Sequence, residues 1–363
     1  MYVYGDISTD ARVQRAANAL KKDFDVTLVS TQKHKKIPEF DFESILVGGR
    51  FSNSMLDFFD TIWQTWKIVK KQKPSILYCH DYYSALLARL FLGRKDCKKI
   101  IYDAHELIIP EKGVKFTLRS RFIYNNEKNI IKKVDLLLCA SDKRGEIMKI
   151  HYNLQILPIT IRNISQLSVN NCDEKTQDII NSLKDFFAKP GYTVVYAGVV
   201  NRSRRIDELV DAVSFLSDKC KLLVVGDGDF IHELQTKSKK YPELVSYFTG
   251  KVPYSSLGSI LSLCDIGFIY YPNDTLNNIN CASNKIYEYA SVNLPIVANN
   301  NPIIKKDLDT YRIGVASDNF IEALTTIIPQ LSSFKSNCKE YNNVFKWEKE
   351  EEILRNSVNR LKV

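Results

Sequence analysis

Short apolar runs alternate with amphipathic stretches along the first part of the chain. The runs 26–30 (VTLVS), 75–79 (SILYC), 99–103 (KIIYD) and 135–139 (DLLLC) are apolar along almost their whole length, as expected of strands buried on both faces. Between them, apolar residues recur at helical spacing, so the alternation predicts a doubly wound parallel sheet. Further strands are expected at 1–5, 45–47 and near 154–157, with helices at 10–20, 56–72, 83–92, 117–132 and 142–150.

A second series of the same kind begins at strand 193–197 (TVVYA), after a polar stretch with one charged helix near 174–188. With 363 residues the chain suits two domains. We therefore predict two facing Rossmann-like domains with a ligand cleft between them, at the carboxyl ends of the strands. The domains are 1–165 and 166–344, and a final amphipathic helix in 345–363 packs back on the first. Further strands are expected at 221–225, 245–248, 266–270, 294–298 and 313–315, and helices at 206–216, 230–240, 255–263 and 282–291, with Ile279 in a loop.

Positive charge is concentrated in the first domain. Residues 1–165 hold 28 Lys and Arg against 18 Asp and Glu, whereas residues 166–363 hold 23 against 24. The excess is either a solvated basic face or a surface that meets an anionic partner, such as a membrane or a phosphorylated acceptor. No basic helix with interleaved aromatic residues occurs, so nucleic acid is not an expected partner.

Several classes of protein are excluded by missing motifs. No run approaches the ~18 apolar residues of a membrane span, and no signal peptide is apparent, so we expect a cytoplasmic protein. The eight cysteines form no CxxC pair and no zinc spacing. No GxGxxG follows the first strand, which argues against a dinucleotide-dependent dehydrogenase. We expect no bound metal and no cofactor.

A phosphate site is predicted where the helix 282–291 begins. Ser283, Asn284 and Lys285 occupy its first turn, where free backbone N–H groups and the positive end of the helix dipole favour an anion. Glu288 lies one turn further along the same face. A carboxylate beside a phosphate site is suited to accept two ribose hydroxyls, so the stretch predicts a nucleotide-diphosphate pocket.

Two further segments follow strands of the second domain. Arg202, Arg204 and Arg205 come after strand 193–197, and guanidinium groups bind phosphate oxygens in pairs, so Arg204 is the first choice for the diphosphate, ahead of Arg202 and Arg205. Gly226-Asp227-Gly228 is either a tight strand-to-helix turn or a turn that also lines the ligand cleft.

In the first domain, polar residues follow three strands. His105 comes at the end of strand 99–103, where it could donate to a sugar hydroxyl or stabilise charge. His80 occupies the equivalent end of the preceding strand. The loop after the first strand contains Asp6, Ser8, Thr9 and Asp10. These residues either cap the next helix, a role favoured for Asp10, or belong to a loop whose backbone N–H groups face the donor phosphates or the acceptor.

Taken in order, these segments resemble a GT-B glycosyltransferase of the retaining family 4 type. The resemblance covers nearly the whole chain, and its best-matching segment is Ser283–Ala290 followed by Leu294–Val297. The other segments that carry the resemblance are Asp10–Val13, Tyr102–Glu106, Gly198 with Arg204–Leu209, Val225–Gly228, Phe248–Pro253 and Cys264–Gly267.

The resemblance implies a role for each matching position. Glu288 would bind the nucleotide ribose, Arg204 the diphosphate, and the helix start at Ser283, Asn284 and Lys285 the distal phosphate. The backbone around Lys251 and Val252 would hold the base, and His105 would lie near the transferred sugar. The family's Glu-x7-Glu motif is incomplete, because Asn280 stands at its first position. The expected catalytic residues are His105, Arg204, Lys285 and Glu288, with Gly228 lining the donor site and Asp6, Ser8, Thr9 and His80 on the acceptor side.

The predicted reaction is metal-independent, retaining transfer of a hexose from a UDP-sugar, or from a GDP-sugar, to a hydroxyl of a glycan or lipid-linked acceptor in polysaccharide or glycoconjugate synthesis. The protein would work in the cytoplasm, peripherally at the inner face of the membrane. Two alternatives remain open: a nucleotide-sugar 2-epimerase of the same fold, and a non-catalytic nucleotide-sugar-binding protein, which Asn280 suggests.

Overall fold

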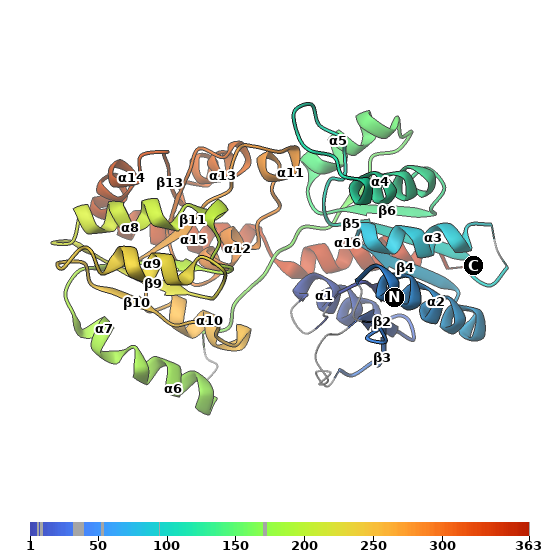
Figure 1. Ribbon diagram of the computed structural model, residues 1–363, viewed down its shortest axis with the longest axis horizontal. Helices are drawn as coiled ribbons and strands as arrows, with labels where there is room; N and C mark the ends of the chain where they lie inside the picture. The colour runs from blue at the N-terminus through green and yellow to red at the C-terminus, as the bar shows by residue number, and fades with distance from the viewer. Residues whose placement is uncertain are drawn as a thin grey trace. The chain divides into compact units, whose positions relative to one another are not determined.

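The chain forms two compact α/β units (Figure 1). A computed structural model describes all residues except Asp6, Ser8, Thr9, 32–39, 52–53, 94, 170–172 and 363. The first unit comprises Met1–Asn163 and Glu348–Val363, and the second comprises Ile164–Trp347.

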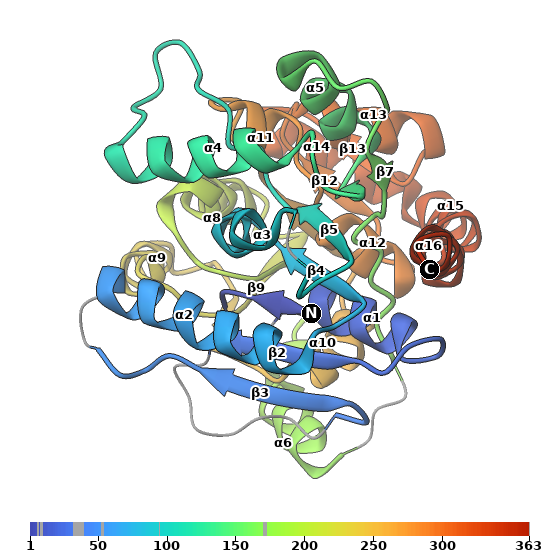
Figure 2. The same ribbon diagram turned by 90° about the vertical axis from the view of Figure 1, so that its right-hand side faces the viewer.

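Within the described residues, the first unit contains a seven-stranded sheet in the order β3-β2-β1-β4-β5-β6-β7, paired in parallel throughout. Figure 2 shows helices on both of its faces, with α2, α3 and α4 on the same side. The strands are β1 (Tyr2–Val3), β2 (Thr27–Thr31), β3 (Glu43–Val47), β4 (Ile76–His80), β5 (Lys99–Ala104), β6 (Leu136–Cys139) and β7 (Ile159–Thr160). The helices are α1 (Ala11–Leu20), α2 (Ser54–Gln72), the 3₁₀ turn η1 (Tyr82–Ser84), α3 (Ala85–Phe91), α4 (Leu118–Ile130) and α5 (Asp142–Tyr152).

The last helix, α16 (Trp347–Asn359), belongs almost entirely to the first unit. Its buried Glu350 accepts hydrogen bonds from the backbone N–H of Arg162 at 2.8 Å and from the Arg162 guanidinium at 2.9 Å. Arg355 makes a two-pronged ion pair with Asp23, just beyond α1, at 2.7 and 3.0 Å. Through these contacts α16 is bound to Asp23, near the start of the chain, and to Arg162, near the end of the segment Met1–Asn163.

The second unit is built on a six-stranded parallel sheet, in the order β10-β9-β8-β11-β12-β13 among the residues described. Its strands are β8 (Tyr192–Ala197), β9 (Cys220–Val225), β10 (Ser246–Phe248), β11 (Ile266–Ile269), β12 (Ile296–Ala298) and β13 (Gly314–Ala316). Its helical segments are α6 (Glu174–Ser182), α7 (Lys184–Ala188), η2 (Arg202–Arg204), α8 (Ile206–Phe215), α9 (Ile231–Ser238), α10 (Tyr254–Leu261), α11 (Leu276–Ile279), α12 (Asn284–Ser291), α13 (Pro302–Tyr311), α14 (Phe320–Ile327), η3 (Ile328–Gln330) and α15 (Leu331–Val344).

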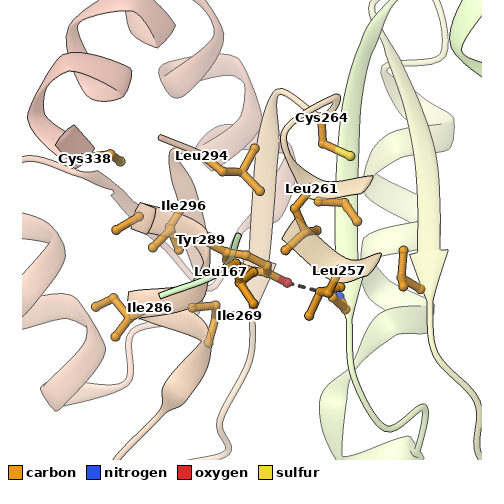
Figure 3. Packing of buried hydrophobic residues seen from close by; sticks show 14 of the residues in the cluster. Leu167, Leu257, Leu261, Cys264, Ile269, Ile286, Tyr289, Leu294, Ile296 and Cys338 are labelled. Carbon is orange, nitrogen blue, oxygen red and sulfur yellow. Dashed lines mark hydrogen bonds between the residues drawn. The ribbon is translucent and has the colours of Figure 1, made fainter. Parts of the chain in front are cut away.

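Alternate residues of each strand enter two hydrophobic cores, one on each face of this sheet. From β8, Val195 and Ala197 join the core under α10, α12, α13 and α15, whereas Val194 and Tyr196 join the core under α8, α9 and α14. Figure 3 shows the first core, in which the Tyr289 hydroxyl accepts a hydrogen bond from the backbone N–H of Ala197 at 3.1 Å. This bond ties α12 to the carboxyl end of β8, where the candidate site lies.

Several predicted elements need correction. The strand expected near 154–157 is instead β7 (Ile159–Thr160), because α5 runs on to Tyr152 and ends in a left-handed cap at Asn153. The single helix expected over 174–188 breaks into α6 and α7, and Ile279 lies in the short helix α11 rather than in a loop. The helices α13, α14 and α15 were not predicted.

Candidate functional site

The site in the second unit begins at the amino end of α12. Ser283 is the N-cap residue, and its side chain makes no capping hydrogen bond within the described part of the chain. The first-turn N–H groups of α12 are therefore not satisfied by the side chain that usually caps a helix. An anion placed there would meet these donors and the positive end of the helix dipole.

Lys285 projects from this first turn toward the end of β8. Its Nζ donates to the carbonyl oxygen of Ala197 at 2.5 Å and lies 5.5 Å from the centre of the Tyr196 ring. Burial lowers the pKa of the Lys285 ammonium, the Glu288 carboxylate raises it, and Arg204 lowers it further. The three charged side chains thus act on one another, and an anion beside Lys285 would favour its charged form.

Arg204 is the last residue of the 3₁₀ turn η2, which follows β8. Its guanidinium donates to the carbonyl oxygen of Tyr270 at 2.9 Å and stacks 4.4 Å from the centre of the Tyr271 ring. The side-chain amide of Asn299 holds the backbone of Tyr271 in place. It accepts a hydrogen bond from the Tyr271 N–H at 3.1 Å and donates one to the Tyr271 carbonyl oxygen at 2.8 Å. No carboxylate in the described regions pairs with Arg204, so its charge is open to a ligand.

The neighbouring arginines are placed differently. Arg202 pairs with Glu233 and stacks on Phe230, and Arg205 pairs with Glu208 at 2.5 Å. Both side chains are exposed. The structure therefore brings Arg204, but neither of its neighbours, into electrostatic contact with Lys285.

Glu288 completes this group one turn along α12. Its side chain is 8% exposed, and its carboxylate accepts a hydrogen bond from the Tyr254 hydroxyl at 3.0 Å. It shares the helix face of Lys285, as the sequence spacing predicts. Asn284, the first residue of the helix, is half-buried beside them.

A glycine turn at Gly198 lies beside Lys285, and a second glycine turn at Gly226 packs against the first. Gly198 has a φ of +139° and Gly226 a φ of +138°, and a Cβ at Gly226 would collide with the backbone of Gly198. Likewise a Cβ at Gly228 would meet the backbone of Val200. The predicted tight turn at 226–228 is therefore also a close backbone approach to the loop that follows β8.

We expect Gly226→Ala to lower the free energy of unfolding by about 1–3 kcal/mol, since it adds both backbone strain and a clash. Urea unfolding measures this change, and Gly49→Ala is the matched control. Gly49 also has a positive φ, but a Cβ there meets nothing within 4 Å. Equal losses in the two variants would remove the clash as the cause.

The remaining residues that were predicted to bind the donor lie after β10 and at the end of α11. Lys251 is exposed and Val252 is half-buried against the core, just after Gly250 pairs with Gly226. Asn280 is buried, and its side-chain amide donates to the carbonyl oxygen of Leu276 in its own short helix at 2.8 Å. Asn280 thus caps α11 instead of presenting a charge.

A second polar cluster lies at the carboxyl ends of β4 and β5 in the first unit. Asp103 accepts two hydrogen bonds from the Arg12 guanidinium, at 2.6 and 3.1 Å, and a third from the Tyr78 hydroxyl at 3.0 Å. His80 and His105 each approach the same carboxylate to 3.5 Å and lie 3.4 Å from each other. The structure thus joins His80 and His105, which the sequence placed at the ends of neighbouring strands.

The two histidines differ in charge preference. Burial lowers the pKa of His80 to about 4. Burial also acts against the His105 imidazolium, but the Asp103 carboxylate outweighs it and raises the pKa of His105. Burial alone would raise the pKa of Asp103, but Arg12 and the histidines hold it well below its usual range. The carboxylate thus favours the protonated form of His105, the more exposed of the two rings, over that of His80.

The donor set does not suit a metal ion. Ligand atoms of His80, Asp103 and His105 lie within 4.8 Å of one another. Both Asp103 oxygens, however, already bind the Arg12 guanidinium, whose positive charge would oppose a cation. A pairing of Arg12 with Asp103 is the simpler account of this cluster.

Some predicted residues cannot be placed, and some contributors were not predicted. Asp6, Ser8 and Thr9 lie outside the described residues, so their acceptor-side role stays a prediction. Tyr254, Tyr271 and Asn299 were not among the candidates, because each acts through a partner distant in sequence. No role was predicted for Arg12, which lies in the segment Asp10–Val13, although it is the main partner of Asp103.

Comparison with known proteins assigns a class to this arrangement. Residues 11–161 match the model of Glycosyltransferase Family 4, and residues 191–332 match that of Glycosyl transferases group 1. No curated protein sequence matches the chain significantly.

Solved structures superpose over nearly the whole chain. Sucrose-phosphate synthase from Thermosynechococcus elongatus does so with a TM-score of 0.75 at 16% identity, covering 96% of this chain and 92% of that protein. HepE from Anabaena in complex with UDP-glucose gives a TM-score of 0.75 at 11% identity, over 99% and 98%. WaaG, a glycosyltransferase involved in lipopolysaccharide biosynthesis, gives 0.71 at 13%, over 98% of each chain. These likenesses show the fold.

The two parallel-sheet units and both family matches define a glycosyltransferase of the GT-B fold. Within that class, the chain is a family 4-like glycosyltransferase. This confirms the predicted fold class and the resemblance drawn from the motifs. Among the described helices, none has both the length and the apolar character needed to cross a membrane.

Proposed function

We propose that the protein moves a sugar from a nucleotide-diphosphate donor to a hydroxyl of a glycan or lipid-linked acceptor, with retention of the anomeric configuration. One observation carries the proposal: Arg204, Lys285 and the amino end of α12 meet at the carboxyl edge of the second sheet, with Glu288 one turn away. The positive groups suit a diphosphate, and the carboxylate suits a ribose. A UDP-sugar is the proposed donor, in line with the UDP-glucose complex of HepE, and a GDP-sugar is the alternative.

The mechanism follows from where charge develops. As the bond between the sugar C1 and the phosphate oxygen breaks, negative charge gathers on the departing diphosphate, and Arg204, Lys285 and the α12 dipole stabilise it. The acceptor oxygen forms the new bond to C1 on the same face, and its proton passes to the leaving phosphate oxygen. His105 would contact the transferred sugar.

The positive charge that stabilises the departing diphosphate comes from Arg204, Lys285 and the α12 dipole. We therefore propose that neither a metal nor a further cofactor is required, and that EDTA leaves the rate unchanged.

The donor pocket can be tested by nucleotide affinity. We expect Arg204→Ala and Glu288→Ala each to weaken UDP binding at least about tenfold, since each removes a charged hydrogen-bonding group. Isothermal titration calorimetry measures the change. Arg202→Ala and Arg205→Ala are matched controls with smaller expected losses, because their guanidinium groups are already paired with carboxylates. If the affinity survives both Arg204→Ala and Glu288→Ala, the pocket is wrongly assigned.

Two other functions make different predictions. A nucleotide-sugar 2-epimerase would convert the donor without an acceptor, so incubation with the nucleotide sugar alone separates it from a transferase. A non-catalytic binding protein is suggested by Asn280, whose amide bonds to its own helix where the family motif has a glutamate. Such a protein would bind nucleotide but release none from any donor, even with membrane extract.

A further inference from the structure

One face of the first unit exposes large apolar side chains at helical spacing. On α2, Met55 is 62% exposed, Phe59 46% and Trp63 48%, at intervals of four residues, and Leu56 lies beside them at 54%. The opposite side of α2 is buried against the unit. Soluble surfaces rarely gather apolar residues in this way without a partner.

The amino-terminal half of α4 extends this apolar face. Phe122 is 42% exposed, and its ring centre lies 6.1 Å from that of Phe59. Leu118, one turn earlier, is 84% exposed. Figure 2 shows α2 and α4 on the same side of the sheet. We call Met55, Leu56, Phe59, Trp63, Leu118 and Phe122 the α2/α4 face.

Basic residues border this face. Lys67 holds its ammonium 3.4 Å from the centre of the Trp63 ring, and Lys70 holds its own 4.7 Å from Trp66. On α4, Arg119 and Arg121 are exposed. None of these four cations pairs with a carboxylate in the described parts of the chain. Tryptophan with lysine at the edge of an apolar stripe is the pattern of a helix that lies in a lipid headgroup region.

A series of aromatic contacts connects the α2/α4 face to the polar edge of the sheet. Ring centres lie 5.4 Å apart from Phe59 to Phe58, 5.1 Å from Phe58 to Tyr4, and 5.2 Å from Tyr4 to Tyr83. Tyr4 directly follows β1, and Tyr83 lies in η1, three residues after His80. The face therefore adjoins the sheet edge that carries the two histidines.

We propose that the α2/α4 face docks on an anionic lipid bilayer, with the apolar side chains in the interface and the Lys and Arg side chains on the lipid headgroups. This rests on the proposed function in one respect: a lipid-linked acceptor held in that bilayer would reach the sheet edge at His80 and His105. Basic side chains that have no carboxylate partner in the described residues favour anionic lipid over a neutral apolar partner.

Vesicle flotation tests the proposal. The full chain is floated with vesicles of phosphatidylcholine alone, or of phosphatidylcholine and phosphatidylglycerol in equal parts. We expect strong recovery only with the anionic vesicles. Lys67→Glu with Lys70→Glu should lower the partition coefficient at least about tenfold, and Phe59→Ser with Trp63→Ser should abolish recovery.

Phe215→Ser is the matched control, because Phe215 is 71% exposed at the end of α8 in the other unit. Equal recovery of the wild type with neutral and anionic vesicles overturns the proposal, as does an equal loss in Phe215→Ser. A self-associating face would show as a dimer in light scattering that Phe59→Ser with Trp63→Ser dissociates, without vesicle binding.

Failure of docking and failure of the donor pocket are distinguishable. UDP affinity in the absence of vesicles depends on Arg204 and Glu288, so variants of the α2/α4 face should keep it within about twofold. A protein that floats but does not bind nucleotide refutes the proposed function alone. A protein that binds nucleotide but does not float refutes the docking surface alone.

Discussion

Lys285→Met is expected to lower the rate of sugar transfer by about 10²–10³-fold, the usual effect of removing one preorganised group from a developing negative charge. Lys285 joins two parts of the site, since it lies in the first turn of α12 and its ammonium donates to the carbonyl oxygen of Ala197 at the end of β8. Methionine keeps most of the length of the side chain but carries no charge. Release of UDP from a panel of UDP-sugars, in the presence of membrane extract as the acceptor source, measures the rate.

Lys305→Met is the matched control for this change. Lys305 is exposed on α13, and its ammonium already pairs with the Asp309 carboxylate at 3.0 Å. It should keep its activity and its thermal unfolding midpoint. A Lys285→Met protein that folds normally and turns over at the wild-type rate would rule out diphosphate stabilisation by this residue.

Arg12→Met is expected to lower the free energy of unfolding by about 3–5 kcal/mol, because it leaves the buried Asp103 carboxylate without its main partner. Arg12 also donates to the carbonyl oxygen of Ile161 at 2.6 Å and to Asn163 at 2.9 Å. Urea unfolding at neutral pH measures the loss. The double variant Arg12→Met with Asp103→Leu should recover part of it, since no buried charge is then left unpaired.

The same pair predicts a dependence on pH. In the wild type the pKa of Asp103 is held well below 3.8, so its contribution to stability is complete above that pH and is lost as the pH falls through the folded-state pKa. In Arg12→Met, burial without the guanidinium raises this pKa instead. The deficit of the variant should therefore shrink as the pH is lowered from 7 toward 4. A deficit that is constant with pH would mean that lost packing, not lost charge pairing, causes it.

Local spacing accounts for how well the sequence predicted the positions of the candidate donor-site residues. The helical repeat alone places Lys285 and Glu288 on one face of α12, and a turn after a parallel strand places Arg204 at the same edge of the sheet. The choice among the three arginines depends on partners. Glu233 and Glu208 neutralise Arg202 and Arg205, and a motif does not record which side chains are already paired.

The sequence pattern does not predict contacts between residues that lie far apart in the chain. Arg12 and Asp103 are 91 residues apart, and Tyr254 and Glu288 are 34 apart. Each contact depends on the order of strands in a sheet, which periodicity does not specify. The helix α15 was missed for a different reason: only Leu331, Cys338 and Tyr341 of this helix are buried, so its apolar pattern is weak.

The attachment of α16 has a consequence for how the protein is made. The ion pair of Asp23 with Arg355 spans 332 residues, and Arg162 reaches Glu350 across 188. During synthesis, the first unit lacks these contacts until the whole second unit has emerged from the ribosome. Loss of the last helix would therefore leave the earlier-made half incomplete. We expect a released chain that stops before Trp347 to expose its first unit to protease while its second unit is protected.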